Sequence, residues 1–563
     1  MVLALAPATA SAAGLVSPVR YDRPPEGWTR SASEVLRIAD ALPEVRRVRA
    51  SRTLTYRRAY LADRSPRRWQ ASYFAPPGSR GGRTEEVAQV LVDDRRAVVL
   101  ERWTGPQVEW TMARGYSGAF GGAANAPWVW IAFCGLFALP FLRPPWRLLH
   151  LDLAVLLAFS VSYAYFSAAR IDVSVPLAYP GLLYLLGRMG AIALSRSRAR
   201  DKAPRPPLAL LVPARYLGIG VVFLLGARAG LNLFGSGVID VGYASVVGAD
   251  RLAGGRALYG AFPPDIAHGD TYGPLTYLAY VPFEWLAPWS GAWDDLPAAH
   301  AAALAFDVLC AAGLWRLGRL VRGPELGALL AWGWVSYPFS LLVLQSNGND
   351  GLVALLVIGA LLALASPGRR GALVAAGSLA KFAPLALAPL MLTYRGGLRA
   401  GEAPTSPRVA RRAVAGFAVV TILALALAGD LRRFFDRTLG FQGDRGSPFS
   451  VWGLYGGLEG LQAAVLVAAG VLALAVAFVP RQRDVIVVSA LAAAVLVALQ
   501  LAVDHWFYLY LVWFMPPVLL ALLAPYAEPP SSGRSTDSIE SARPGEEARM
   551  STALSHGSSS AAS

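Results

Sequence analysis

About eleven long apolar segments follow one another along most of this chain, and they constrain its fold more than any other feature. A helix needs about 20 apolar residues to cross the hydrocarbon core of a bilayer, and each segment is near that length. Only 16% of the 563 residues are charged, and the mean hydropathy is +0.43. Since a soluble domain carries about 25% charged residues, we expect a mainly α-helical protein that crosses a membrane many times. The expected spans are 127–142, 148–166, 174–194, 208–234, 297–315, 323–344, 352–366, 413–429, 458–479, 485–503 and 507–525.

Basic residues gather in short gaps between these segments, as in "SRSRARDKAPRPP" (195–207). Under the positive-inside rule such gaps lie in the cytoplasm, while the less basic gaps, including the loops 235–296 and 430–457, lie outside. We therefore expect a multi-pass protein of a bacterial plasma membrane, with its N-terminal domain outside and its C-terminal tail inside. This distribution accounts for the net charge of +15 without nucleic-acid binding, because no basic patch is interleaved with exposed aromatic residues.

Two apolar stretches do not fit as full crossings. The stretch 272–290 is aromatic and broken by proline, so we expect it at the outer interface. The stretch 371–394 has basic flanks on both sides and contains Pro384 and Pro389. It predicts two short helices that form a re-entrant hairpin from the cytoplasmic side, where protein or a water-filled cavity must cover the irregular backbone.

The chain divides by composition into five parts. Residues 1–19 resemble the end of a secretory signal, and 20–122 are polar and predict a small extracytoplasmic α+β domain. This domain contains a capping box at 31–34 before a helix, then three alternating runs, of which 87–94 and 96–103 form a predicted hairpin. Its order of elements resembles a PepSY-like module. The remaining parts are N-terminal transmembrane helices (123–207), a second transmembrane region (208–525) and an expected disordered cytoplasmic tail (526–563).

The absence of several motifs narrows the chemistry. No cytoplasmic gap exceeds roughly twenty residues, too few for a nucleotide-binding domain. The sequence has no glycine-rich phosphate loop and no HExxH, and its five histidines show no metal-ligand spacing. We expect no cofactor, and the metal requirement stays open. Nucleotide-driven pumps, zinc proteases and enzymes that use nucleotide sugars are disfavoured.

An acidic residue, Asp240, follows the apolar segment that ends at Phe234. Burying a carboxylate near lipid costs about 2.5–3.5 kcal/mol on the mildest scale, so its place there suggests a function. The stretch "IDVGYASVVGADRLAGGRALYG" (239–260) followed by "DTYGPLTYLAYVPF" (270–283) resembles glycosyltransferase family 87, a GT-C type of membrane enzyme. Further matches follow in order at 344–350, 379–390, 447–454 and 504–517, so that the resemblance spans about 208–525.

The resemblance implies a transferase that moves a mannose-like sugar from a polyprenyl-phosphate carrier. The acceptor would be a glycolipid or cell-envelope glycan outside the cytoplasm, and GT-C-like outer loops would hold the site. Inversion at the anomeric carbon needs a general base, and a partly desolvated Asp240 is the candidate. Its alternative role is to cap the following helix.

Other polar residues are candidates for contact with the substrates. Cations should face the phosphate leaving group, and these candidates are Lys381, Arg437, Arg445 and His505. The sugar or the acceptor would contact Tyr243, Tyr259, Tyr272, Gln345 and Asn349. Each has a structural alternative, namely headgroup contact, helix termination or interfacial anchoring. For Lys381 the leading alternative is a buried ion pair with Asp307.

Two other classes of function compete with this hypothesis. A lipid-linked glycan ligase or polymerase would need larger outer loops with more arginine. A transporter, or a sensor that reads a periplasmic signal with its N-terminal module, would need no catalytic base. A transporter would also place polar groups on broken helices of two matching halves, and we find no convincing internal repeat.

Overall fold

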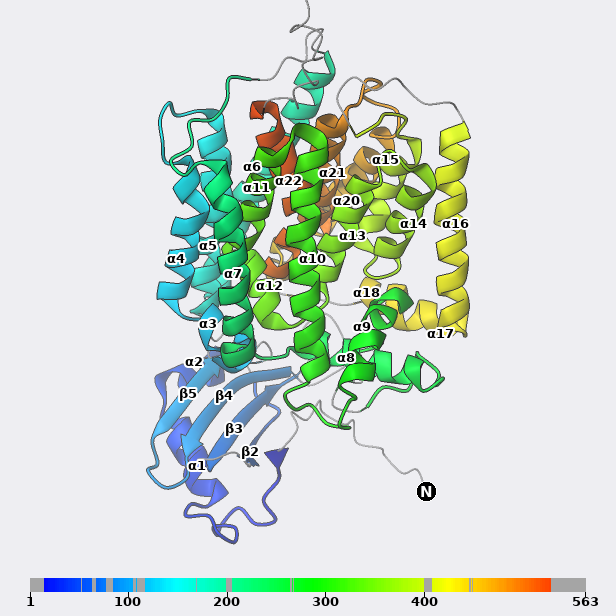
Figure 1. Ribbon diagram of the computed structural model, residues 1–563. Helices are drawn as coiled ribbons and strands as arrows, with labels where there is room; N and C mark the ends of the chain where they lie inside the picture. The colour runs from blue at the N-terminus through cyan, green and yellow to red at the C-terminus, as the bar shows by residue number, and fades with distance from the viewer. Residues whose placement is uncertain are drawn as a thin grey trace, which may run out of the picture.

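The computed structural model describes residues 15–51, 53–62, 67–76, 85–104, 108, 117–168, 170–198, 205–263, 266, 268–398, 408–444, 447 and 449–527. A helical region forms most of the molecule, and a small sheet domain lies at one of its ends (Figure 1). We call this end of the helical region the domain end, because α8, α9, α17 and α18 lie there beside the N-terminal domain. We call the opposite end, where α6 and α10 end and α21 begins, the basic end.

The N-terminal domain is a five-stranded antiparallel sheet in the order β1-β2-β3-β4-β5, with helices α1 and α2. The predicted capping box is confirmed, because Ser31 Oγ accepts from Glu34 N and the Glu34 carboxylate accepts from Ser31 N. The predicted hairpin is also confirmed as β4–β5, and Asp93 Oδ1 accepts two backbone N–H groups in its turn. Strands β1 and β2 and helix α2 were not predicted. The elements are β1 (Leu15–Val16), α1 (Ala32–Asp40), α2 (Pro43–Ser51), β2 (Tyr56–Ala62), β3 (Arg68–Ala75), β4 (Glu85–Asp93) and β5 (Val99–Thr104).

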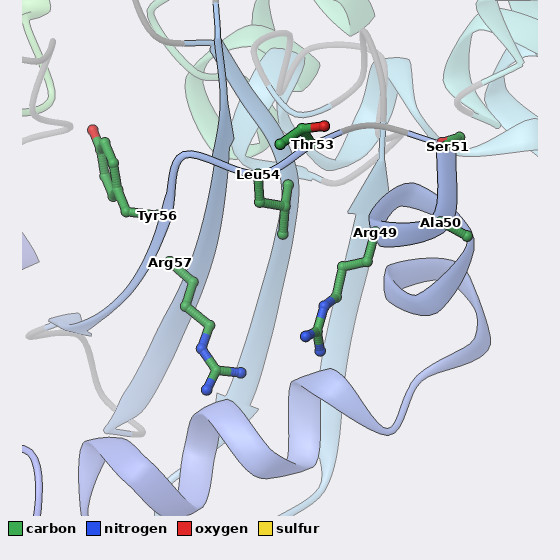
Figure 2. Close-up of a pocket in the computed structure, with 7 residues that line it drawn as sticks. All are labelled: Arg49, Ala50, Ser51, Thr53, Leu54, Tyr56 and Arg57. Carbon is green, nitrogen blue, oxygen red and sulfur yellow. The ribbon is translucent and has the colours of Figure 1, made fainter.

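A hollow of about 540 Å³ lies in this domain between the end of α2 and the start of β2. Figure 2 shows the side chains of Arg49 and Arg57 pointing into it, while Tyr56 points away. Asp40, at the end of α1, pairs with both arginines and accepts from Tyr73 Oη at 3.0 Å. One carboxylate therefore compensates part of the positive charge in the hollow.

The helical region contains long and short helices. Proline is the first residue of α4, α9, α10, α11, α12 and α14, a position where its missing N–H costs no helical hydrogen bond. The elements are α3 (Ser117–Ala124), α4 (Pro127–Ala138), η3 (Leu139–Phe141), α5 (Leu148–Ser167), α6 (Ile171–Arg198), α7 (Ala214–Gly235), α8 (Asp240–Ala253), α9 (Pro274–Leu286), α10 (Pro297–Arg322), α11 (Pro324–Val335), α12 (Pro338–Ser346), α13 (Asp350–Leu362), α14 (Pro367–Ser378), η5 (Ala383–Leu387), α15 (Ala388–Thr393), α16 (Arg408–Ala428), α17 (Leu431–Phe435), η6 (Asp436–Gly440), α18 (Phe441–Asp444), α19 (Val451–Leu454), α20 (Glu459–Ala475), α21 (Val485–Ala502), η7 (Tyr508–Tyr510), α22 (Leu511–Leu523) and η8 (Ala524–Tyr526).

The helices differ in how deeply they are buried. In α21 and in the segment Tyr508–Tyr526, 94% and 89% of the most apolar 18-residue stretch are buried inside the protein. These two neighbours are apolar on every side because they form the core of the helical region. In α16 only 11% of the corresponding stretch is buried, and Figure 1 shows this helix at the edge of the helical region. An apolar helix that packs against so little protein is suited to face lipid.

The expected number of eleven spans is not confirmed. Within the described ranges, seven helices are long and apolar enough to cross a membrane, or eight if α11 and α12, bent by 56°, are one span. The expected spans 127–142, 352–366 and 458–479 correspond to shorter apolar helices, Pro127–Phe141, Asp350–Leu362 and Glu459–Ala475. For the last two, the apolar side chains continue past the point where the helix ends, whereas Pro127–Phe141 follows its apolar segment closely and is itself short.

The stretch 371–394 is broken as its prolines predict. Helix α14 ends at Ser378, and η5 with α15 begins at Ala383. The break between them lies against the start of α9, where Gly273 N and Leu275 N donate to Ala380 O and Leu379 O, both at 3.1 Å. This contact brings the break to the domain end, beside the predicted outer loops.

Candidate active site

Asp240 is the first residue of α8, at the domain end. Its side chain is exposed, and its Oδ1 accepts from Val241 N at 2.9 Å. The cap position of this helix is occupied by Ile239, so the predicted capping role does not apply to Asp240. The expected partial burial is absent as well. Its side chain lies at the surface of the described part of the chain.

The other side of α8 packs closely against the link between α12 and α13. A Cβ on Gly242 would lie 2.3 Å from Asn347 O, so only glycine permits this approach. Asn347 itself turns the chain with a φ of 51°, a conformation that asparagine tolerates. Its Nδ2 donates to Gly237 O at 3.1 Å and thereby holds the link between α7 and α8. Asn347 therefore has a structural role.

Lys381 and Asp350 form a buried ion pair, with Lys381 Nζ 2.6 Å from Asp350 Oδ1. The Asp350 side chain is 1% exposed and the Lys381 side chain 10%. The predicted partner of Lys381 was wrong, because Asp307 instead pairs with Arg228 at 2.5 Å. Asp307 also accepts from Trp334 Nε1 at 2.9 Å. Two acidic residues lie within apolar segments, and helix packing decides which of them meets the lysine.

Aromatic rings surround the Lys381 ammonium on several sides. Its Nζ lies 5.5 Å, 5.4 Å and 5.3 Å from the ring centroids of Tyr272, Tyr510 and Trp513. These distances are within the range of cation–π attraction. Trp513 Nε1 also donates to Asp350 Oδ1 at 3.0 Å. The cluster thus joins α13, the α14–η5 break, α22 and the segment before α9.

This cluster contains acceptor atoms that lack donors. Asp350 Oδ2 and Asn349 Oδ1 are buried and have no hydrogen-bond partner within the described part of the chain. Asn349 Nδ2 contacts Ser245 Oγ at 3.3 Å, so α8 contributes to the same cluster. Leaving a buried acceptor unsatisfied costs about 1–3 kcal/mol. A ligand that brings hydroxyl donors would supply what is missing.

Arg437 lies in a second cluster, in which it pairs with Asp270. Arg437 Nε and Gly260 N both donate to Asp270 Oδ2, at 2.8 Å and 2.6 Å. Asp270 is fully buried, and its Oδ1 has no partner among the described residues. Tyr259 donates to Tyr272 O at 3.0 Å, and burial together with the charge of Asp270 raises the pKa of Tyr259. Tyr259 is thus a neutral donor that fixes the loop 254–273.

His505 lies close to the Lys381 cluster. Its Nδ1 is 2.8 Å from Ser447 Oγ, and its ring packs edge-on against Tyr510, one of the rings around Lys381. Neighbouring Asp504 accepts from Ser447 N at 3.2 Å, which ties the loop before α19 to the end of α21. Of the predicted phosphate-binding residues, Lys381 and His505 are therefore brought together, Arg437 stands in the Asp270 cluster, and Arg445 lies outside the described residues.

Two other predicted sugar-binding residues lie among packed side chains. Tyr243 is fully buried and stacks on Trp293 with centroids 4.9 Å apart. Gln345 is fully buried at the end of α12. Both positions favour packing over ligand contact. The sequence interpretation omitted Asp270 from its site residues, although it is a charged residue beside an apolar segment, a signal that could have identified it.

The described residues contain no group of three or more His, Cys, Asp or Glu side chains arranged to hold a metal ion. The clusters described above offer one carboxylate each, with a cation as its partner. Their chemistry is that of hydrogen bonding and charge pairing.

The apolar helices indicate a membrane protein, and its buried polar clusters lie at the domain end. Residues 271–503 match the model of Glycosyltransferase family 87, so this part of the chain is similar to that family of glycosyltransferases. The matched range contains Tyr272, Gln345, Asn349, Lys381, Arg437 and Arg445, whereas Asp240, Tyr243, Tyr259 and His505 lie outside it. It does not reach the N-terminal domain, where the PepSY-like resemblance stays a prediction. No curated protein matches the chain.

Proposed function

We propose that this protein transfers a mannose-like sugar from a polyprenyl-phosphate carrier to a glycolipid or cell-envelope glycan, with inversion. The reaction takes place at the domain end, which we assign to the outer face of a bacterial plasma membrane. The family match supports sugar transfer. The carrier is what the family resemblance implies, and it suits an outer site, since nucleotide sugars are absent outside the cytoplasm and a lipid would have to deliver the donor.

Asp240 is the proposed general base. As the acceptor oxygen attacks the anomeric carbon, its carboxylate takes the hydroxyl proton, and the bond from the anomeric carbon to the phosphate oxygen breaks. The phosphate leaves with the bonding electron pair. The observation that carries this assignment is the exposed position of Asp240 at the start of α8, at the end where the polar clusters lie. Partial desolvation would then come from bound substrate and lipid.

The Lys381 cluster is the proposed donor site. A phosphate gains negative charge as it leaves, and a nearby ammonium lowers the energy of that charge. Lys381 Nζ is held by Asp350 and by three rings, which fix its position in advance. The acceptor atoms Asp350 Oδ2 and Asn349 Oδ1 suit sugar hydroxyls, and the aromatic rings suit the apolar face of a sugar. Tyr272 and His505 lie at the rim of this cluster.

A reconstituted transfer assay tests this function. The full chain in proteoliposomes is given a radiolabelled polyprenyl-phosphate mannose and extracted envelope glycolipids as acceptors. Asp240→Asn should lower the transfer rate by a factor of about 10²–10⁴, since a general base contributes that much. It should leave the thermal unfolding temperature unchanged, because the side chain is exposed.

The matched control is Asp250→Asn on the same helix, where the carboxylate pairs with Arg256. This variant should keep its transfer rate. If Asp240→Asn transferred sugar as fast as the wild type, Asp240 would not be the general base. No transfer of any lipid-linked sugar by the wild-type chain would reject the function. The anomeric configuration of the product, read by NMR, tests inversion.

A further inference from the structure

A buried arginine at the basic end lacks an acceptor for one of its guanidinium nitrogens among the described residues. Arg322 is the last residue of α10 and is only 7% exposed. Its Nε–H has no hydrogen-bond partner within the described part of the chain. A buried charge without a partner costs several kcal/mol. The position therefore needs a compensating negative group.

A second arginine and one acid lie beside it. Arg196, near the end of α6, donates from Nε to Asp484 Oδ2 at 2.8 Å, and both side chains are about one-tenth exposed. Asp484 Oδ1 accepts from Val487 N at 2.9 Å and so caps α21. The charges of Arg196 and Asp484 both act on Arg322. The one carboxylate is thus already engaged, and Arg196 Nη2 also lacks an acceptor among the described residues.

The charges in this cluster do not balance. Two guanidinium groups face one carboxylate, which leaves one positive charge. Arg322 and Arg196 lie in the last turns of α10 and α6, where the helix dipole favours a cation only modestly. That gain is smaller than the cost of burying an unpaired charge. The Nε of buried Arg370 also lacks an acceptor among the described residues, but its Nη2 donates to Tyr394 O at 2.9 Å and its Nη1 to Leu364 O, whereas Arg322 has no such contact to a described residue.

We propose that Arg196 and Arg322 bind a phosphate group at the basic end. A phosphate offers several acceptor oxygens and a negative charge, and guanidinium groups bind it through paired N–H donors. The site lies at the ends of two long apolar helices, the level at which lipid headgroups meet a membrane protein. The phosphate belongs either to an anionic lipid headgroup of that leaflet or to a free phosphate ion. This site is separate from the proposed transfer reaction at the domain end.

The experiment measures binding by the full chain purified in detergent. Dioctanoyl phosphatidylglycerol, dioctanoyl phosphatidylcholine and inorganic phosphate are titrated separately, and the thermal unfolding temperature and retained lipid, by native mass spectrometry, are recorded. Phosphatidylglycerol should raise the unfolding temperature of the wild-type chain more than phosphatidylcholine does. Arg322→Gln should weaken its binding roughly tenfold or more, since a hydrogen bond to a charged group contributes about 1.5–3 kcal/mol.

Arg316→Gln, on the exposed side of the same helix, is the matched control and should bind like the wild type. Arg322→Lys keeps the charge with fewer donors and should bind with intermediate strength, which also keeps the test valid if Arg322→Gln does not fold. A response to inorganic phosphate alone would support the phosphate site with the free ion as its ligand. Equal binding of phosphatidylglycerol by wild type and Arg322→Gln, or no response to any probe, would overturn the proposal.

Discussion

Lys381 Nζ lies 2.6 Å from Asp350 Oδ1, although the two residues stand 31 positions apart on different helical segments. The pair lies where the broken segment after α14 meets the start of α13, and α22 supplies Trp513 against both side chains. Buried ion pairs are weak evidence for stability, because desolvation offsets much of their attraction. Stability is therefore a poor explanation for this pair. The unsatisfied carboxylate oxygen of Asp350 instead favours a role for the pair in the proposed donor site.

A double substitution separates the stabilising role of this pair from its functional role. Lys381→Met leaves Asp350 buried without its cation and should destabilise the protein by about 3–5 kcal/mol. The double variant Lys381→Met/Asp350→Leu should recover most of this loss, because apolar residues then fill the site. Sugar transfer should remain lost in both. Thermal unfolding in detergent and the transfer assay give the two readouts, and an active double variant would remove the pair from the proposed donor site.

The Arg228–Asp307 pair is the matched comparison. Arg228 Nε and Nη2 hold both oxygens of Asp307, and its Nη1 donates to Val335 O at 3.0 Å. Arg228→Met should destabilise the protein by a similar amount, about 3–5 kcal/mol. Arg228→Met/Asp307→Leu should recover both stability and transfer activity. If the double variant regained stability but not transfer activity, the Arg228–Asp307 pair would have a role in the reaction, which its hydrogen bonding within the protein does not suggest.

Gly273 sets the approach of α9 to the break that carries Lys381. A Cβ at this position would lie 1.9 Å from Leu379 O, so Gly273→Ala must displace the backbone that positions the ammonium. We expect a fall in unfolding temperature and at least a tenfold fall in transfer rate, since small misplacements of catalytic groups cost that much. Gly226→Ala in α7, where a Cβ would meet no atom within 4 Å, should be neutral or slightly stabilising. If Gly273→Ala and Gly226→Ala had the same unfolding temperature and transfer rate, the steric argument would be wrong.

Asp270 holds the loop 254–273 against the segment 436–440. Asp270→Asn weakens the bonds from Gly260 N and Arg437 Nε to this fully buried side chain. We expect faster limited proteolysis within the loop and a higher KM for the acceptor, with a smaller effect on kcat. Asp172→Asn removes an exposed pair with Arg170 and should change neither readout. A loop that resists proteolysis as well as the wild type does would show that Asp270 is not its anchor.

Local signals in the sequence were sufficient to predict several structural elements. The capping box at Ser31 and the hairpin turn at Asp93 depend on contacts within a few residues, so their patterns predicted them correctly. The apolar segments predicted helices, and the prolines at 384 and 389 predicted the break before η5. The short strand β1 was missed, because two residues carry no periodic pattern. Asp240 was expected in the outer loop after α7, and it begins α8 there.

The sequence alone determined that the chain forms apolar helices with most of its polar groups at their ends. Long runs of apolar side chains favour burial in lipid or protein, and a helix satisfies the backbone hydrogen bonds there. Only the tertiary structure decided which buried charges meet. Asp307 and Asp350 are both acids placed with apolar segments, and nothing local distinguishes them as partners for Lys381. The attraction that selects between them falls with distance and requires contact within a few ångströms, so it depends on how α7, α10, α13 and α22 pack together.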